Sequence, residues 1–375
     1  MIYRVIGTMS GSSLDGLDIV FAELEESGGK WSYEIKAAAC YLYDENWMSK
    51  LQNAIHLNAY DYLLLHSAYG KYCAEKIHRF IEENNLHHQI QLIASHGHTV
   101  FHAPQFGMTA QLGDGATIAA ITQINVVSDL RSIDVALGGE GAPIVPIGEK
   151  LFWENYSLLL NLGGIANISA SLNLSNKNSA ASQGNFIAFD VCPANRILNM
   201  LVQKEEKEFD KDGNIARSGL INNALIEELN RLDYYKKSYP KSLSNNFGTE
   251  IIFPLIQSYN ISTADSLRTY VEHIAEQIKN AILFINHEPS TINHQLLVTG
   301  GGAFNIFLIE SLKNKLQKLN VEIIIPDSQL IKYKEALIMA LLGVLRWREE
   351  NTVLNSVTGA SRSSIGGAVW IGQEA

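Results

Sequence analysis

The sequence predicts an α/β protein, and two observations support this class. Short apolar runs rich in β-branched residues alternate with longer segments whose apolar residues recur every three to four positions. This alternation is typical of strands and helices that follow each other along the chain. In addition, three strand-like runs lead into glycine-rich turns, within residues 7–16, 163–167 and 300–302.

Length, charge and cysteine content exclude several classes of protein. The 375 residues correspond to about two or three domains with real apolar cores. A net charge of −10, with both signs interspersed, predicts no nucleic-acid or anionic-membrane partner. The three cysteines lack a C-x-x-C spacing, which argues against a disulfide framework or a structural zinc site. Without an evident leader or an apolar run of about 18 residues, we expect a cytoplasmic protein.

The first element is a hairpin, "VIGTMSGSSLDGLDIVFAEL", at residues 5–24. Its turn contains only small, hydroxylated or acidic side chains apart from Leu14, so backbone N–H groups are exposed. Clustered N–H donors and hydroxyls can hold an anion, and neighbouring carboxylates suit Mg²⁺ bound through water. An ordinary hairpin closed by Asx and Ser turns would have the same composition.

The later elements follow the same alternation. Helical periodicity is clear at residues 69–81 and 267–282, and Ser262 with Asp265 is a capping pair for the second of these helices. Strand-like runs occupy residues 91–95, 124–130, 156–162, 186–191, 295–300 and 321–326.

The segment "LLLNLGGIANIS", residues 158–169, repeats the plan of the opening hairpin and predicts a weak internal duplication. A nucleotide offers two phosphate groups and an adenosine, which three glycine turns could hold. The P-loop pattern is absent, and "GGGAFN" does not fit the dinucleotide fingerprint. The sequence therefore indicates a different nucleotide-binding fold.

The ordered motifs resemble those of the 1,6-anhydro-N-acetylmuramic acid kinase family over about residues 6–367. The motifs that carry the resemblance are "IGTMSGSSLDGLD", "SHGHTVFH", "QLGDG", "SDLRSIDVALGGEGAPIVP", "LNLGGIANIS", "FDVCPANRILN", "KSLSNNFG", "LLVTGGGAFN", "YKEAL" and "SVTGA". The resemblance is specific, because the long "DVALGGEGAPIVP" block is unlike generic sugar kinases.

The resemblance implies a member of the superfamily of actin, sugar kinases and heat-shock chaperone ATPases. Two ribonuclease-H-like domains are then expected to close over ATP in a cleft between them. We expect the first domain at residues 1–135 plus 350–375 and the second at 136–349. The implied enzyme opens the anhydro sugar with water and phosphorylates O6, giving N-acetylmuramic acid 6-phosphate and ADP in peptidoglycan recycling. The resemblance also implies a homodimer.

The resemblance assigns roles to individual residues. Asp190 is expected to be the base that activates water. The ATP phosphates and adenosine are expected at Gly11, Ser12, Ser13, Leu14, Asp15, Gly16, Leu17, Asp18, Gly163, Gly164, Asn167, Gly300, Gly301 and Gly302. The sugar is expected to contact His98, Thr99, Arg131 and Glu335. Asp15 or Asp18 would hold Mg²⁺ through water.

Each assignment has a structural alternative. Asp190 could cap the following helix, Arg131 could form a surface pair with Asp129, and Glu335 could be an exposed helical carboxylate. Asp15 and Asp18 could serve solely to stabilise their turn. The turn at 300–302 could be the start of a helix that binds no ligand.

The segment "SHGHTVFH" raises a different alternative, because His96, His98 and His102 could form a metal site. A zinc site usually needs a further ligand and outer partners, and the sequence shows neither.

The chain departs from the commoner family pattern at three places. It has Gly-Ser-Ser in the hairpin where Gly-Thr-Ser is usual, "FDVCPAN" for "DTGPGN", and His98 where Gln is frequent. None of these changes removes an ionisable group, so they bear on substrate contacts more than on the reaction. The rival functions are a kinase for another hexose and a non-catalytic nucleotide-binding regulator. A requirement for a substrate carboxylate at Arg131 would separate the first from the implied enzyme, and Asp190 with the hairpin carboxylates argues against the second.

Overall fold

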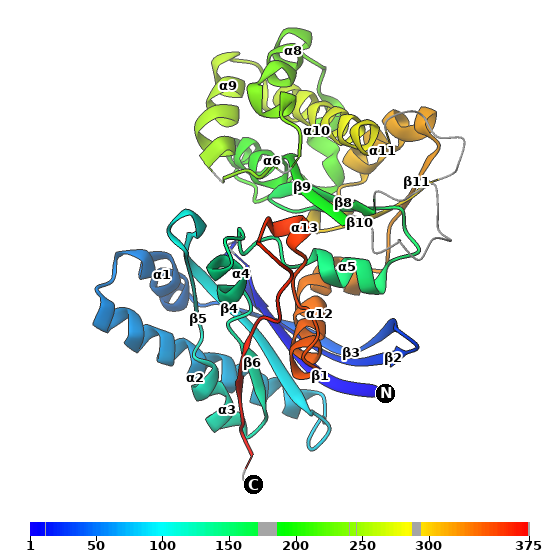
Figure 1. Ribbon diagram of the computed structural model, residues 1–375. Coiled ribbons are helices and arrows are strands. Elements are labelled where there is room, and N and C mark those ends of the chain that lie inside the picture. Colours follow the sequence, from blue (N-terminus) through cyan, green and yellow to red (C-terminus); the bar gives the residue numbers. More distant parts are fainter. Residues whose placement is uncertain (12, 172–185, 240, 245, 287–293, 374–375) are drawn as a thin grey trace. The chain divides into compact units, whose positions relative to one another are not determined.

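The computed structural model describes residues 1–11, 13–171, 186–239, 241–244, 246–286 and 294–373 (Figure 1). The chain divides into two compact units, Met1–Glu154 with Tyr333–Ala375 and Asn155–Lys332. The first unit thus includes residues 136–154 and 333–349, which the sequence assigned to the second domain; the expected domain boundaries stay a prediction.

The first unit is built on a mixed sheet with strand order β12-β6-β4-β1-β2-β3, to which β5 adds by pairing with β4. Strands β1, β2 and β3 form an antiparallel meander, and β4 and then β6 continue parallel to β1. The strands are β1 (Ile2–Ser10), β2 (Gly16–Ser27), β3 (Lys30–Leu42), β4 (Leu92–Ala103), β5 (Met108–Leu112), β6 (Val126–Ser128) and β12 (Ala368–Trp370).

The second unit contains a five-stranded sheet in the order β11-β10-β7-β8-β9 among the described residues. Strands β7, β8 and β9 are antiparallel neighbours, whereas β10 and then β11 run parallel to β7. The strands are β7 (Leu158–Leu162), β8 (Ile165–Ser171), β9 (Phe186–Pro193), β10 (His294–Thr299) and β11 (Val321–Ile324).

The two sheets share one topology: three antiparallel strands in sequence, then two strands parallel to the first of them. This is the arrangement expected of two ribonuclease-H-like units, and it confirms the α/β class. It also supports the internal duplication that the two hairpins predicted.

Helices connect and cover the strands of each unit. In the first unit they are α1 (Glu45–Asn53), α2 (Ala59–Glu83), α3 (Gly115–Thr122), α4 (Ser132–Ala136), α5 (Pro146–Phe152), most of α12 (Ser328–Trp347) and α13 (Asn355–Thr358). In the second they are α6 (Asn195–Val202), α7 (Asn214–Ser218), α8 (Asn223–Arg231), α9 (Phe253–Ser258), α10 (Thr263–Asn286) and α11 (Ile306–Leu316).

The two helical faces read from the sequence are buried as expected. Residues 69, 72, 73, 77, 80 and 81 of α2 lie in the core of the first unit, and residues 267, 270, 271, 274, 278 and 282 of α10 in that of the second. The cap of α10 is also confirmed, because the Asp265 N–H donates to Ser262 Oγ at 3.0 Å. Burial of these apolar faces is the main stabilising term for both units.

Helix α12 packs directly on the backbone of β1 and β4 in the first unit. A Cβ on Gly7 would lie 2.0 Å from the carbonyl oxygen of Ala336 and 2.7 Å from the nitrogen of Ala340, and one on Gly343 would lie 2.5 Å from Ala94 Cβ. Because strand side chains alternate, Gly7 faces α12 while its neighbour Ile6 joins the core that includes α2. The sheet therefore lies between α2 and α12 (Figure 1).

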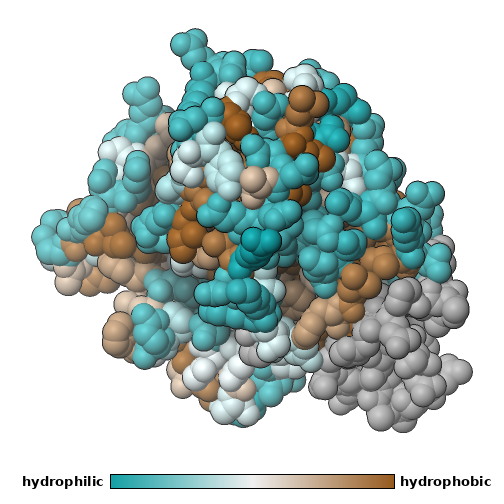
Figure 2. Space-filling view, turned by 90° about the horizontal axis from the view of Figure 1, so that it is seen from above, coloured by the Kyte–Doolittle hydropathy of each residue, from teal (hydrophilic) through white to brown (hydrophobic). Residues whose placement is uncertain are grey.

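The surface drawn in Figure 2 is mixed in character. Hydrophilic residues predominate on this face, and hydrophobic ones gather in small groups between them. In the part of the chain that the structure describes, no helix has the length and apolar content to cross a membrane.

The close packing of α12 predicts a large effect of a small substitution. Gly7→Ala should lower the free energy of unfolding by about 3 kcal/mol or more, because the new methyl group must push a helix backbone aside. Urea unfolding measures the effect. Gly107→Ala is the control: it places a methyl in open space at φ +69°, so only backbone strain of about 1–2 kcal/mol is expected. Equal losses in the two variants would contradict the packing argument.

Candidate active site

The turn between β1 and β2 spans the residues that follow Ser10, whose Cα pairs with that of Leu17. Ser13 and Asp15 are exposed, and Leu14 adopts φ +61°, with its N–H directed to the Gly11 carbonyl at 3.4 Å. Of the expected phosphate residues, Gly16, Leu17 and Asp18 already belong to β2, and Ser12 lies outside the described residues.

Three carboxylates gather beside this turn. Burial raises the pKa of Asp18 to about 6; the negative charges of Glu335 and Asp15 add to the rise, while a hydrogen bond from the Cys40 thiol opposes it. Glu335 is half-buried on α12, rather than exposed as the structural alternative proposed. No backbone N–H of the turn bonds to Asp15 or Asp18 among the described residues, which gives no support to a purely turn-stabilising role.

His98 lies on β4 beside the end of β1. Its Nδ1 is 3.0 Å from Ser10 Oγ, and its ring is edge-on to that of Tyr69. Burial lowers the pKa of His98 to about 4, so the imidazole is neutral at physiological pH. Thr99 follows it on the same strand and is half-buried.

Arg131 is paired with a histidine instead of an aspartate. Its Nε donates to His96 Nε2 at 2.9 Å, and His96 Nδ1 lies 2.9 Å from the Gly97 carbonyl. Because that carbonyl can only accept, His96 carries its proton on Nδ1. Burial, and then the charge of Arg131, lower the pKa of His96 to about 3, so its Nε2 stays an acceptor. Asp129 accepts a hydrogen bond from Ser132 instead, so the alternative of a surface pair with Arg131 is not seen.

Among the described residues, the Arg131 guanidinium is hydrogen-bonded through Nε alone. Burial lowers its pKa to about 10, with the charge of Glu335 opposing the shift, so it remains a cation at neutral pH. In the described parts of the chain, its two terminal nitrogens make no hydrogen bond and no carboxylate lies within ion-pair distance. A partly buried cation with free donors suits an anionic ligand.

The histidine metal site is not formed by the described residues, where no group of three or more candidate ligands occurs. His96 is bonded to Arg131, His98 to Ser10, and His102 Nδ1 lies 3.2 Å from Thr109 Oγ1.

In the second unit, Asp190 is fixed by three contacts near the end of β9. Leu243 N–H donates to its Oδ2 at 2.8 Å, Tyr234 OH donates to its carbonyl at 2.7 Å, and its own N–H donates to the Lys241 carbonyl at 3.3 Å. Burial raises the pKa of Asp190, and the Leu243 bond opposes the rise. The helix that follows has Ala194 as its N-cap, so Asp190 does not cap it.

The second glycine turn lies close to Asp190. Asn167 on β8 is the Cα partner of Asp190 on β9, so the two residues are cross-strand neighbours. The Gly163 and Gly164 carbonyls accept hydrogen bonds from N–H groups at the start of α6, namely those of Asn195 at 3.1 Å and Ala194 at 2.8 Å. These bonds anchor the turn on the first turn of α6.

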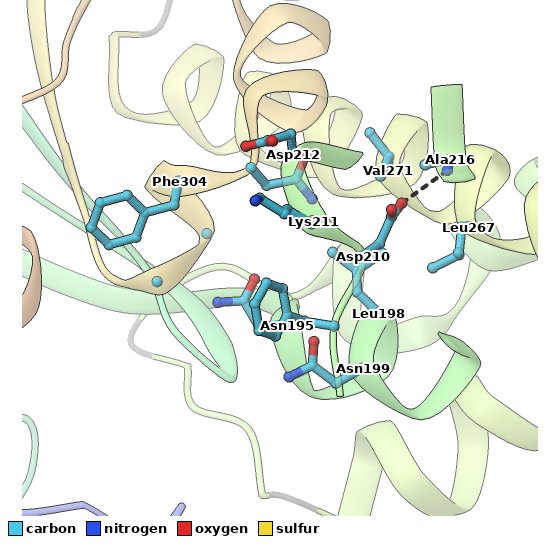
Figure 3. A pocket seen from close by; sticks show the side chains of 14 residues that line it. Asn195, Leu198, Asn199, Asp210, Lys211, Asp212, Ala216, Leu267, Val271 and Phe304 are labelled. Carbon is cyan, nitrogen blue, oxygen red and sulfur yellow. Dashed lines mark hydrogen bonds between the residues drawn. The ribbon is translucent and has the colours of Figure 1, made fainter. Parts of the chain in front are cut away.

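The third glycine turn borders a pocket of about 420 Å³ (Figure 3). Gly300 has φ +79°, and a Cβ there would lie 2.7 Å from Asn161 Oδ1, so this turn also meets the end of β7. Gly301 and Gly302 line the pocket; the other lining residues are Asn195, Leu198, Asn199, Phe209, Asp210, Lys211, Asp212, Ala216, Leu267, Val271, Phe304 and Asn305.

Most of these lining residues were missed in the sequence. Asp210 caps the start of α7 through bonds to the N–H groups of Ile215 and Ala216, and so holds the turn that carries Lys211 and Asp212 at the rim. The polar run "DKDGN", with its glycine, is the signal that could have identified this turn. The pocket has an apolar floor, and polar groups and Phe304 form its wall. Such a lining suits a heteroaromatic ligand.

The structure thus gathers the predicted residues into two groups. The first unit brings together the β1–β2 turn, His98, Thr99, Arg131 and Glu335. The second brings together Gly163, Gly164, Asn167, Asp190 and the turn at 300–302.

Comparison with known proteins gives full-length matches. A family model described as anhydro-N-acetylmuramic acid kinase matches residues 3–372. A relative of that name from Bacillus cereus is 30% identical, over 97% of this chain and 98% of the relative. One from Sulfurimonas denitrificans is 31% identical with the same coverage.

Among solved structures, the chain is similar to an activator of the 2-hydroxyisocaproyl-CoA dehydratase from Clostridium difficile with bound ADPNP. The TM-score is 0.44 at 14% identity, over 93% of this chain and 96% of that chain. A likeness at this level supports no inference about the present protein.

Proposed function

Because the chain belongs to the anhydro-N-acetylmuramic acid kinase family, we propose that it uses ATP and water to convert 1,6-anhydro-N-acetylmuramic acid to N-acetylmuramic acid 6-phosphate and ADP. This reaction belongs to the recycling of cell-wall peptidoglycan. The observation that carries the proposal is the fixed carboxylate of Asp190, held through Oδ2, while Oδ1 accepts no hydrogen bond from the described residues and is open to a water molecule.

Asp190 acts as the general base in this proposal. Water attacks C1 of the anhydro sugar, Asp190 takes the proton, and the C1–O6 bond breaks. O6 then bonds to the γ-phosphorus as the bond from that phosphorus to the β-phosphate oxygen breaks and ADP leaves. Departing glycosidic oxygens normally need an acid to protonate them, but here the phosphoryl group captures O6. A raised pKa makes Asp190 a stronger base than an ordinary aspartate.

Glycine turns would hold the phosphates of ATP. The N–H groups of Gly11 and Ser13 and those of the Gly163–Gly164 turn suit the phosphates, since phosphoryl transfer depends mainly on positioning and charge neutralisation. The pocket beside Gly301 has the size and lining for adenosine.

Mg²⁺ fits the carboxylates beside the first turn. Burial is the main cause of the raised pKa of Asp18, and the negative charges of Glu335 and Asp15 add to it; a cation would relieve this repulsion. Since no three direct ligands converge among the described residues, Asp15 and Asp18 would contact the ion through its water shell. When bound, Mg²⁺ would neutralise charge on the phosphates.

The sugar would lie against His98, Thr99, Arg131 and Glu335. A muramic acid carries a lactyl carboxylate, and Arg131 offers a preformed cation with free donors to receive it. Glu335 would accept a hydrogen bond from a sugar hydroxyl. We also propose a cytoplasmic location and a homodimer.

Product analysis tests the proposed function. The protein is incubated with ATP, Mg²⁺ and anhydro-N-acetylmuramic acid, and the products are identified by mass spectrometry. We expect a ring-opened 6-phosphate and ADP in equal amounts. Turnover of a free hexose or N-acetylhexosamine in place of the anhydro sugar would favour another sugar kinase, and ATP binding without consumption would favour a regulator.

Asp190→Asn should lower turnover by about 10²- to 10⁴-fold, because a positioned general base is lost. Ring opening and phosphoryl transfer should fail together, while ATP and sugar still bind in calorimetry. Asp233→Asn is the control, since Asp233 is exposed and pairs with Lys236. In ¹⁸O water, the early product of the unaltered enzyme should carry label at the C1 oxygen. A variant within about threefold of the unaltered enzyme, or label in the phosphate, would exclude Asp190 as the base.

Arg131→Ala should raise the KM for the sugar by about 10- to 100-fold and change kcat little. The lost charged hydrogen bond is made equally in the ground state and the transition state, so it contributes uniform binding. Steady-state kinetics at saturating ATP measure the effect. Arg79→Ala removes an exposed pair with Glu83 and serves as the control. An unchanged sugar KM would show that Arg131 is only a structural partner of His96.

Phe304→Ala should weaken ATP binding by about 5- to 150-fold, because stacking of a base on an aromatic ring contributes roughly 1–3 kcal/mol. Phe304 is 42% exposed at the pocket wall, so the fold should tolerate its truncation. Calorimetry with ATP measures the change, and Phe106→Ala, at a side chain that is 82% exposed in the first unit, is the control. Unaltered affinity would place the adenosine elsewhere.

A further inference from the structure

A buried chain of hydroxyl groups ends at His98. Tyr69 on α2 and Tyr43, just after β3, have their hydroxyl oxygens 2.5 Å apart. Tyr43 OH donates to Ser10 Oγ at 2.7 Å, and Ser10 Oγ lies 3.0 Å from His98 Nδ1. All four side chains are less than a tenth exposed, so water does not compete freely for these bonds.

The order of donors along the chain decides which nitrogen of His98 carries the proton. Tyr43 has one proton and gives it to Ser10, so Tyr69 must be the donor in the bond between the two tyrosines. The single hydroxyl proton of Ser10 is then free to be donated, and the other hydrogen-bond partner of Ser10 is His98 Nδ1. In the reverse arrangement His98 Nδ1 donates to Ser10, Ser10 to Tyr43 and Tyr43 to Tyr69. The fully buried Tyr69 proton is then left with only the Cys73 sulfur, a weak acceptor, which is costly. Nδ1 is therefore the acceptor.

A neutral imidazole that accepts at Nδ1 carries its proton on Nε2. Burial keeps His98 neutral, as its lowered pKa indicates. In the described parts of the chain, Nε2 has no hydrogen-bond partner.

We infer that Tyr69, Tyr43 and Ser10 are positioning residues that hold His98 as a neutral Nε2–H donor, which selects an uncharged oxygen of the sugar, such as a hydroxyl or the acetamido carbonyl. The inference rests on the proposed function, because it takes the sugar as the ligand. It divides recognition between two groups: the cation of Arg131 receives the carboxylate, and the neutral N–H of His98 receives an oxygen without charge. The aromatic cluster behind the hairpin thereby acquires a role in specificity.

The chain offers a matched pair of variants for the test. Tyr43→Phe removes the proton donated to Ser10. Tyr72→Phe removes a hydroxyl in the same aromatic cluster, stacked on Tyr69, that is buried and has no hydrogen-bond partner among the described residues. Both changes delete a single oxygen from a tyrosine, so general effects on packing are matched.

The first measurement is ¹⁵N NMR of the histidine ring nitrogens in the full-length protein without ligands, with the His98 signals assigned through His98→Gln. We expect Nε2 protonated and Nδ1 unprotonated in the unaltered protein and in Tyr72→Phe. Tyr43→Phe should shift the His98 signals towards the other tautomer, because Ser10 can then accept from Nδ1–H. Protonation of Nδ1 in the unaltered protein would overturn the inference, whether or not the variants fold.

The second measurement is steady-state kinetics. Tyr43→Phe should raise the KM for the sugar about 3- to 10-fold relative to Tyr72→Phe, with the KM for ATP unchanged and kcat altered less than about twofold. Equal sugar KM values in the two variants would overturn the role in recognition. A protein with the expected tautomer that does not bind or convert the sugar would overturn the proposed function and the sugar contact, while supporting the hydroxyl chain itself.

Discussion

The candidate site of the first unit depends on how closely α12 approaches the sheet. Gly7 and Gly343 remove the two side chains that would hold the helix away, so its backbone rests on β1 and β4. A buried ion pair between Lys334 and Glu149, with Nζ and Oε1 at 2.7 Å, ties the N-terminal part of α12 to α5. Glu335 follows Lys334 directly on this helix, and its charge acts on both Asp18 and Arg131. Replacing either partner of the ion pair alone would leave an uncompensated buried charge.

The two units hold their candidate site residues by different physical means. In the first, neutral acceptors and hydroxyls orient the important groups: His96 orients Arg131, and Ser10 orients His98. In the second, backbone groups hold Asp190: the N–H of Leu243 donates to its carboxylate, and the carbonyl of Lys241 accepts from its main-chain N–H. Backbone donors are independent of side-chain identity, so the setting of Asp190 tolerates sequence change in residues 241–243 better than the setting of Arg131 tolerates change at His96.

The sequence predicted the fold well because its signals are local. The buried faces of α2 and α10, the six later strands and the cap at Ser262 follow from periodicity and residue type, and the structure has them all. Resemblance to a family supplied the candidate residues around them. The partner of Arg131 was not predictable, since His96 and Arg131 are distant in sequence and meet only because β4 and β6 pair in parallel. The pocket was missed for a related reason: its wall comes from α6, α7, α10 and the turn after β10, which no local pattern connects.

The shared topology of the two sheets bears on the evolution of the protein. Asp18 is the third residue of β2 and Asn167 the third residue of β8, and their cross-strand partners are Cys40 on β3 and Asp190 on β9. Each half thus carries one carboxylate at an equivalent pair of cross-strand residues. In the first half it lies on the earlier strand, β2, and in the second half on the later strand, β9. Duplication of an ancestral half-gene gives this result when each copy is selected for a separate task. A substitution that improves one half then has no direct cost in the other, which lets the two halves diverge at different rates.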